Sequence, residues 1–466
     1  MARISLPAQG RRKRRRAAPI ARLVLLLVPA GTGCATYEPD PIDPSAMLAD
    51  LAARRWDPPA APGDPAAADP EQLASFAVAH HPALAAARAR IGVARSLLVE
   101  AGLLADPAIG WNGMDALAAE IVEGRAASID FLTGLGLSIP LPRPGEIDAR
   151  TGVARGEVEE ARRRVVQAEW TLAREVHLAC EDLLELEGLL EQNLDLVQVA
   201  ESTRDYFARA MAAGAATAIQ ANLAAGDLLA IRAERVRLEA RRRDARHRLN
   251  ALLGLPPETA VPVRAGPRAD DGPPEAPPPN VEELVASSLS RRPDLAALFA
   301  SYQAAEEAVR LEVSRQFPLA AVGTGITLEP GLFTRFNRPA IATALARRAA
   351  LRAEIEAQVH EARREIQDAF AAREEAHREV RFLASELLPN AEESLRLAGE
   401  AFASGEVTVL EILTLQRNLV DARTRTTEAR AELQRRHWRL LAASGTLLPP
   451  GDAPDSPTDR HETAIR

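Results

Sequence analysis

Long helical segments dominate the pattern of apolar and polar positions along this 466-residue chain. From Glu157 to Ala213 there is no proline and only one glycine, and the sequence is rich in the helix formers Ala, Leu, Glu and Arg. A rise of 1.5 Å per residue gives such a helix a length of about 85 Å. A second helix is expected to end near Leu253, and the same plan is expected from Leu345 to Ala403 and from Thr408 to Ala443.

These helices are expected to pack side by side. Apolar positions form one stripe and charged residues occupy the other faces, which is typical of coiled-coil packing. Helices of this length do not fit a compact domain. Pro389 is expected to kink or break the third long segment, because proline cannot donate the helical backbone hydrogen bond.

The two halves of the chain repeat one plan. The segment that begins at Pro82 returns at Pro293, an offset of 211 residues, and each copy runs about 25 residues to another proline. Further along, an offset of 191 relates three pairs of residues: Gly214 and Gly405, Thr217 and Thr408, and Gly254 and Gly445. The smaller second offset indicates an internal duplication in which the second half has lost about 20 residues between its first and second helices.

Between the short and long helices the apolar period changes to two, which predicts strands. Residues 131–139 and 321–328 place apolar side chains on one face and small or polar ones on the other. Weaker strands are expected at Ala108–Asn112 and Pro339–Leu345. This alternation fits the wall of a transmembrane β-barrel, although a soluble amphipathic hairpin has the same pattern. Because four strands cannot close a barrel in lipid, several chains would share one, and three copies would give 12 strands.

The N-terminus predicts export. Its first 33 residues hold eight Lys or Arg and no acid, followed by an apolar run, and end at Cys34 within GTGC. This pattern resembles a lipoprotein signal, in which Cys34 would be acylated, and ordinary signal-peptide cleavage is the alternative. Removal of these residues leaves 49 basic and 65 acidic residues, a formal charge of −16, so no nucleic-acid partner is expected.

Changes of composition divide the chain further, since the Pro-rich stretches are typical of extended linkers. The expected segments are a lipoprotein-type signal peptide (1–33), an extended leash (34–70), a first structural repeat (71–255), a Pro-rich linker (256–280), a second repeat (281–448) and a disordered tail (449–466).

Little in the sequence supports catalysis. Lys13 is the only lysine, and no phosphate loop, dinucleotide fingerprint or serine nucleophile motif occurs. The eight histidines do not group with Cys or carboxylates at metal-ligand spacing. Cys180 is expected to be a small packed residue within a long helix. We therefore expect no enzyme, no cofactor and no metal site.

Three stretches carry a family resemblance. They are the paired segments HPALAAARAR and RPDLAALFAS, the strand-to-helix passage LSIPLPRPG, and AFASGEVTVLEILTLQRNLVDAR. In this order the chain resembles the TolC-type outer-membrane efflux channels, particularly the lipoprotein branch that serves drug or heavy-metal pumps, over about Glu71 to Leu448. One departure is the second half, where GLFTRFNRPAIATALARRAALRAE offers only a weak fourth strand.

The resemblance implies a fold and partners. The fold class is mainly α, with duplicated long-helix hairpins that form a trimeric α-barrel continued by a small shared membrane β-barrel. The homotrimer would lie in outer-membrane lipid, extend into the periplasm, and meet a periplasmic adaptor protein and an inner-membrane pump of the RND type.

Two Gly-bounded turns, Gly214–Gln220 and Gly405–Glu411, have the T-x-x-Q and T-x-x-E spacing of a helix capping box. The resemblance implies that they form the periplasmic tips where the adaptor docks and the tube narrows, with Glu411 lining the aperture. Three copies of Glu411 would make an anionic ring that attracts cations. The candidate site residues are Cys34 for lipidation and Gly214, Thr217, Gln220, Gly405, Thr408 and Glu411 for the tips.

The sequence thus favours a passive trimeric efflux duct for small molecules or metal ions. Two alternatives remain open at this stage. One is a lipid-anchored periplasmic helical scaffold, and the other is a degenerate paralogue that assembles but does not conduct.

Overall fold

A computed structural model describes residues 37–56, 67–111, 135–266, 280–323, 326–329, 335–404 and 406–447. Of the predicted features, the signal peptide, Cys34, Gly405 and the tail 449–466 lie outside these residues. The chain divides into two units, Met1–Leu51 and Ala52–Arg466. Helix α2 (Pro44–Ala53) begins in the first unit, where the Asp43 carboxylate accepts a hydrogen bond from the Ser45 amide at 2.9 Å. Part of the expected extended leash is therefore helical.

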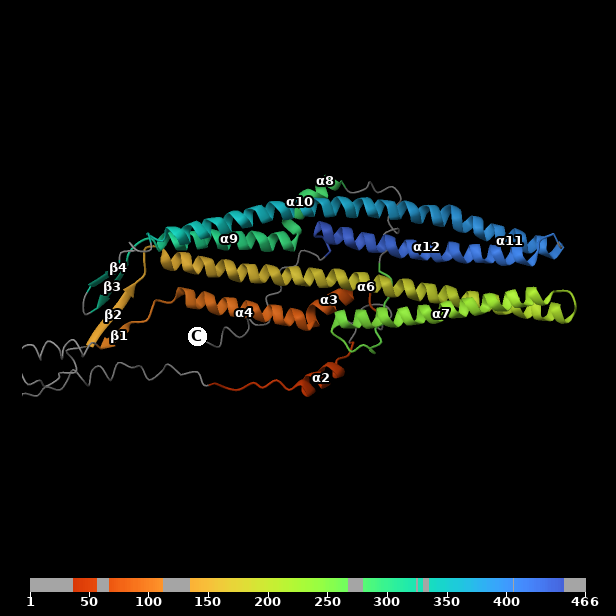
Figure 1. The fold of residues 1–466 in the computed structure, drawn as a ribbon, viewed down its shortest axis with the longest axis horizontal. Coiled ribbons are helices and arrows are strands. Elements are labelled where there is room, and N and C mark those ends of the chain that lie inside the picture. Colours follow the sequence, from red (N-terminus) through yellow and green to blue (C-terminus); the bar gives the residue numbers. More distant parts are fainter. Residues whose placement is uncertain are drawn as a thin grey trace, which may run out of the picture. The chain divides into compact units, whose positions relative to one another are not determined.

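The second unit repeats one order of elements in its two halves (Figure 1), which confirms the mainly α fold with duplicated helical hairpins. The helices of the first half are α3 (Pro70–His80), α4 (Pro82–Gly102), α6 (Glu146–Ala212) and α7 (Ala218–Leu253). Those of the second half are α8 (Val281–Arg291), α9 (Pro293–Ser314), α10 (Arg338–Phe382), α11 (Leu388–Ser404) and α12 (Val409–Ser444). Within the described residues, no helix combines the length and apolarity that a membrane crossing requires.

Helix α6 is the element on which the others assemble. Its 67 residues correspond to about 100 Å at 1.5 Å per residue. Helices α4 and α9 pack on its first part, α7 and α12 pack on its second part, and α10 lies against α9 and α12 (Figure 1). The long helices thus run side by side, as the sequence predicted.

The largest buried cluster forms where α3, the middle of α6, and the ends of α7 and α12 meet. Leu73, Val176, Leu183 and Leu249 are fully or almost fully buried there. Cys180 lies in the same cluster with no exposed surface, so its predicted packing role is confirmed, and burial raises the pKa of its thiol.

Helix α6 begins at Glu146, not at Glu157 as predicted. Gly152 and Gly156, which precede the predicted start, lie within α6 at its contact with α9. A β-carbon on Gly156 would lie 2.6 Å from the Cβ of Ala304, so the two backbones approach closely only because this position has no side chain. The glycines mark a helix contact instead of a helix boundary.

In the part of the chain that the structure describes, the sheet has four antiparallel strands in the order β1-β2-β3-β4. They are β1 (Ala108–Trp111), β2 (Leu135–Leu141), β3 (Leu319–Gly323) and β4 (Ile326–Glu329). Two strand predictions were wrong. Residues 321–328 do not form one strand, because Val322 pairs with Ile326 and the chain turns back between them. The strand expected at Pro339–Leu345 is helical, since Pro339 sits in the first turn of α10, where its fixed φ and missing N–H are tolerated.

The third long segment is interrupted just before Pro389, since α10 ends at Phe382, but the helical path does not end there. One π-helical turn, Leu383–Leu387, precedes α11, and the Leu388 amide donates to the carbonyl of Leu383. Proline has no N–H to donate and its ring crowds the carbonyl four residues before it, so a wider turn relieves both problems. The helical path therefore continues through the proline.

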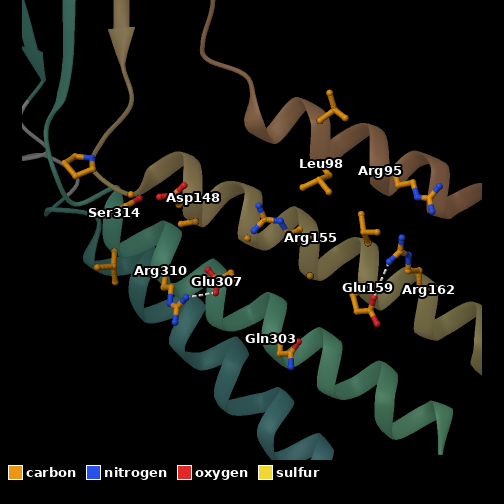
Figure 2. Close-up of a pocket in the computed structure, with 18 of the residues that line it drawn as sticks. Arg95, Leu98, Asp148, Arg155, Glu159, Arg162, Gln303, Glu307, Arg310 and Ser314 are labelled. Carbon is orange, nitrogen blue, oxygen red and sulfur yellow. Dashed lines mark hydrogen bonds and ion pairs between the residues drawn. The ribbon is translucent and has the colours of Figure 1, made fainter. Parts of the chain in front are cut away.

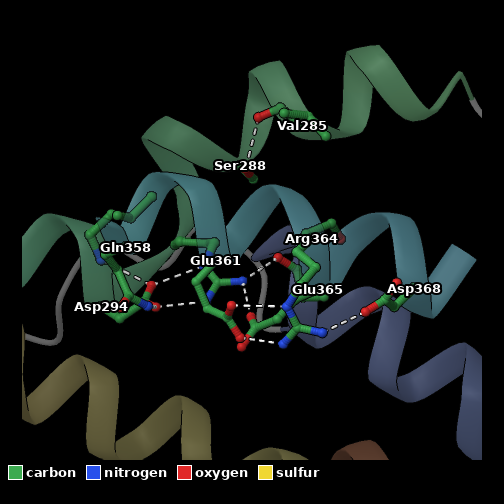
Figure 3. Close-up of polar contacts among 12 residues, drawn as sticks. Val285, Ser288, Asp294, Gln358, Glu361, Arg364, Glu365 and Asp368 are labelled. Carbon is green, nitrogen blue, oxygen red and sulfur yellow. Dashed lines mark hydrogen bonds and ion pairs between the residues drawn. The ribbon is translucent and has the colours of Figure 1, made fainter. Parts of the chain in front are cut away.

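A buried ionic network joins three helices of the second half. Arg292, which is 2% exposed, donates to Asp294 at 2.7 Å, to Glu365 at 2.7 Å and to the Ala443 carbonyl at 3.0 Å. Figure 3 shows the surrounding contacts, with Gln358 beside Asp294. The network ties the start of α9 to α10 and to the end of α12.

Burial and pairing act oppositely on these charges. Burial alone would lower the pKa of Arg292, but its bonds to Asp294 and Glu365 raise that pKa above the ordinary value. Burial would likewise raise the pKa of Asp294, and Arg292 reverses this and lowers it. Each charge is retained because its partner is present.

Two alanine substitutions test the glycine contact. Gly156→Ala should lower the apparent unfolding temperature of the purified protein, because its β-carbon overlaps Ala304 and overpacking of this kind costs roughly 1–3 kcal/mol. Gly92→Ala on α4 is the matched control, since a β-carbon there meets nothing within 4 Å and alanine gains up to ~1 kcal/mol of helix propensity. Circular dichroism melts should move in opposite directions. A stabilised Gly156→Ala protein would contradict the described packing.

Candidate functional site

The candidate site consists of the two turns that close the helical hairpins at one end of the second unit (Figure 1). We call the turn between α6 and α7 and the turn between α11 and α12 the end turns. The first leaves α6 through Gly214, whose φ of 72° is in the left-handed region that glycine occupies without cost. The second leaves α11 at Gly405, which lies outside the described residues.

Both end turns close with a capping box, as predicted. In the first, the Gln220 amide donates to the Thr217 hydroxyl at 3.3 Å, and the Thr217 amide donates to Gln220 Oε1 at 2.8 Å. In the second, the Glu411 amide donates to the Thr408 hydroxyl at 3.4 Å, and the Thr408 amide donates to Glu411 Oε2 at 2.7 Å. The reciprocal bonds satisfy amides that would otherwise lack partners at a helix start.

The two boxes differ in charge. The Thr408 amide and hydroxyl both donate to the Glu411 carboxylate, and these bonds hold the pKa of Glu411 below its ordinary value. Glu411 therefore stays ionised at neutral pH, whereas Gln220 supplies the same geometry without charge. The second end turn therefore carries an exposed negative charge at Glu411, and the first carries the neutral amide of Gln220.

Exposed apolar side chains stand beside both boxes. Ile219 is 73% exposed and Leu410 is 63% exposed, and each is the second residue after its capping threonine. The two positions are related by the same offset of 191 that relates the threonines. The sequence analysis did not single them out, although this offset could have found them.

An ion pair links the two hairpins near the end turns. Arg417 of α12 pairs with Asp227 of α7. The structure thus gives Arg417 a partner on the other hairpin. Arg417 and Asp227 lie nine and ten residues after their capping threonines, so they stand at a similar level of the bundle.

A concave region lies toward the sheet, between α4, α6 and α9 (Figure 2). It is an open groove of about 1240 Å³. Arg310 bonds Glu307 at 2.6 Å, and Arg162 lies 3.8 Å from Glu159. Its charged lining residues are Arg95, Arg155, Arg162, Arg310, Asp148, Glu159 and Glu307. Charges of both signs along one groove select no single ligand class.

In the part of the chain that the structure describes, no group of three or more His, Cys, Asp or Glu residues is placed to hold a metal ion. The buried histidine His177 packs against Trp438, with ring centroids 4.2 Å apart, and its Nδ1 lies 2.7 Å from the Ala173 carbonyl. Burial lowers the pKa of His177 and favours its neutral form. This histidine is part of the packed core.

Hydrogen exchange should separate the two roles of the second capping box. Thr408→Ala removes the cap and should speed exchange at the start of α12, because losing such a cap costs about 1 kcal/mol. Glu411→Gln keeps the box, as Gln220 does in the first end turn, but removes the charge, so its hydrogen exchange should lie between that of the wild type and that of Thr408→Ala. Peptides that cover residues 406–413 give the measurement by mass spectrometry, and Thr217→Ala is the control that should affect only the start of α7.

The same peptides should show a pH dependence with a defined sign. Because the pKa of Glu411 is lowered on folding, its contribution is complete above the ordinary pKa of 4.5 and is lost as the pH falls through the lower folded value. After correction for the intrinsic exchange rate, the protection of wild-type peptides against hydrogen exchange should therefore decrease at acid pH. The protection of the Glu411→Gln peptides should not change. Equal acid sensitivity in both proteins would assign the effect to another group.

A charge exchange tests the link between the hairpins. Arg417→Asp faces Asp227 with a like charge and should speed exchange in residues 406–420 and 217–230, because like-charged neighbours repel. Adding Asp227→Arg restores an attractive pair and should return exchange toward the wild-type rate. An exposed pair is worth only about 0–1 kcal/mol, so a small local effect is expected and global stability should hardly change. No recovery in the double variant would mean that the pair does not couple the hairpins.

Comparisons with known proteins agree with this architecture. The family model described as outer membrane efflux protein matches residues 73–255 and 319–446, which fall in both repeats. No curated protein sequence matches the chain.

Several solved structures share the fold. The outer-membrane channel OprN is 19% identical and aligns over 81% of this chain and 90% of its own, with a TM-score of 0.66. A membrane protein from Pseudomonas aeruginosa is 22% identical over 85% of this chain and 100% of its own, with a TM-score of 0.67. The outer membrane protein VceC from Vibrio cholerae is 18% identical over 81% of this chain and 96% of its own, with a TM-score of 0.64.

Proposed function

The chain belongs to the outer membrane efflux protein family, and on this premise we propose that it acts as a passive homotrimeric duct in a tripartite efflux system. The observation that carries the proposal is the family match in both repeats, on a chain whose long helical hairpins are joined to a four-stranded sheet. The protein supplies a path across the outer membrane, and a partner pump supplies the energy.

The four-stranded sheet supports a β-barrel that is shared between copies of the chain. Among the described residues, β1 and β4 are the outer strands of the sheet, so each offers an edge to a further strand. Open edges are not tolerated in lipid. If three copies pair edge to edge, 12 strands close without a free edge, and the helices of about 100 Å continue the tube into the periplasm.

The end turns are proposed as the docking surface for a periplasmic adaptor protein. Ile219 and Leu410 present apolar surface there, and the capping boxes keep the helix starts rigid beneath them. Three copies of Glu411 would form an anionic ring where the tube narrows. An inner-membrane pump of the RND type is the proposed energy source.

Acylation of Cys34 is proposed as a second membrane attachment. The residue follows the export signal directly, and a Pro-rich segment separates it from α3. The anchor would act together with a sheet that also lies in the bilayer.

A second candidate function is a trimer that assembles without conducting. The observation that favours it is the shortened second half, which the sequence offsets of 211 and 191 make about 20 residues shorter than the first between its first and second helices.

Conductance of the purified protein in planar bilayers, together with its oligomeric mass, tests the duct. A trimer that gives discrete, uniform steps is expected, with a cation preference that Glu411→Gln reduces. Gln220→Glu is the matched control, because it adds a carboxylate to the other end turn without changing the capping geometry, and it should not reduce the preference.

The alternatives give different results in this experiment. A monomer or water-soluble oligomer without conductance would favour a scaffold. A membrane-embedded trimer without conductance would favour the non-conducting candidate.

A further inference from the structure

We propose that a pocket between helices α6, α10 and α12 binds a small dianion of the phosphate class. The pocket lies beside the Arg292 network, because Glu365 of that network is part of its lining. The inference does not rest on the proposed duct, since the site needs neither a membrane nor a partner pump. A bound anion would link a helix of the first repeat to two helices of the second.

Small side chains leave room for a ligand at this place. The pocket has a volume of about 300 Å³ and is open to solvent on one side. Ala369 and Ala372 of α10 and Ala442 and Ala443 of α12 form part of its lining. This volume lies at the lower end of the range for small-molecule sites and suits a small ligand.

Arginine dominates the charged lining of the pocket. Three helices contribute the charged residues, which are Arg174 from α6, Arg364, Glu365 and Asp368 from α10, and Arg436 and Arg439 from α12. Four guanidinium groups therefore face two carboxylates. The planar guanidinium group matches the oxygens of a phosphate and can bond two of them at once.

The two carboxylates are already paired with arginines. Glu365 accepts a hydrogen bond from the buried Arg292 at 2.7 Å. Asp368 accepts one from Arg364 at 2.6 Å, and Arg364 also bonds Glu361 (Figure 3). These pairs offset one another, so the charge that an entering anion meets comes from the three remaining arginines.

Arg174 is a cation without an acidic partner. In the part of the chain that the structure describes, no carboxylate lies within ion-pair distance of Arg174, which lies over the ring of Trp170 at 5.8 Å from the centroid. Arg174 is half-buried and lines the pocket. The indole N–H of Trp170 is covered and has no hydrogen-bond acceptor among the described residues. This wall therefore offers donors and lacks an acceptor.

One carboxylate, that of Glu432, serves the arginines of α12. Arg436 bonds its Oε1, and Arg439 lies 3.6 Å from the same oxygen. Arg435 bonds Oε2 at 2.8 Å and has a second partner in Glu185 at 2.6 Å. Among the described residues, Arg436 and Arg439 thus share a single acidic partner, and their positive charge exceeds the charge that balances it.

The charge of the pocket selects the class of ligand. Arg174 and the pair Arg436 and Arg439 together leave an excess of about two positive charges, which a dianion neutralises and a single carboxylate does not. A free phosphate ion and the phosphate monoester of a larger molecule have this charge in common. Either would stabilise the packing of α6 against α12, because a ligand that binds only the folded state favours that state.

Titration of the full-length protein in detergent with inorganic phosphate tests the inference. At a pH of about 7.5 a phosphate group is mostly dianionic. Isothermal titration calorimetry should show saturable binding, and the unfolding temperature measured by circular dichroism should rise with phosphate concentration. Sodium chloride at the same ionic strength should not produce this rise.

Three glutamine variants assign the binding to the pocket. Arg174→Gln and, separately, Arg439→Gln should each weaken phosphate binding about tenfold or more, because each removes a hydrogen bond between charged groups. Arg164→Gln is the matched control, since Arg164 lies on α6 ten residues before Arg174, is 69% exposed and pairs with Glu160. Its affinity for phosphate should equal that of the wild type. If one pocket variant does not fold, the other still decides the question.

The outcomes distinguish a specific site from general charge effects. Absence of saturable binding, or equal binding by the wild type and all three variants, would overturn the proposed site. Glycerol 3-phosphate distinguishes the two sources of phosphate. Binding of this ester at the same pocket would support a monoester ligand, and its exclusion while phosphate still binds would support the free ion.

Discussion

The packing of the other helices along α6 is the interaction on which the rest of the structure depends. One uninterrupted helix of 67 residues touches α4 and α9 on the side of the sheet and α7 and α12 on the side of the end turns. The distance between the sheet and the end turns is therefore set by helical rise, which varies little. Gly152 and Gly156 let α9 approach α6 closely, and the Arg292 network then holds α9 to α10 and α12. The second repeat is thereby positioned on a helix of the first.

Features that depend on a few neighbouring residues could be predicted from the sequence. The long helices, the duplication and both capping boxes follow from local composition and from the spacing of Thr217 with Gln220 and Thr408 with Glu411. The start of α6 and the fourth strand could not, because each depends on a distant partner. The contact of Gly156 with Ala304 joins two distant helices, and the turn within residues 321–328 is seen only in the pairing of Val322 with Ile326.

The candidate site also combines features set by neighbouring residues with features set by distant partners. The charge of Glu411 and its capping role were visible in four residues of sequence, whereas the pairing of Arg417 with Asp227 joins two helices that are 190 residues apart. The offset of 191 residues could have identified Ile219 and Leu410, because they are equivalent positions of the duplication. Cys34 and Gly405 remain predictions from sequence and family resemblance.

The ion pairs described for this protein all use arginine, and the chain contains no lysine after Lys13. A guanidinium stays protonated at any pH that a folded protein survives, so these pairs lose their charge only from the carboxylate side. It is also a poor nucleophile. Reagents that acylate primary amines, including the common cross-linkers and fluorophore esters, therefore find no side chain to modify in residues 14–466. A lysine introduced at one end turn would be a unique chemical handle on each copy of the chain.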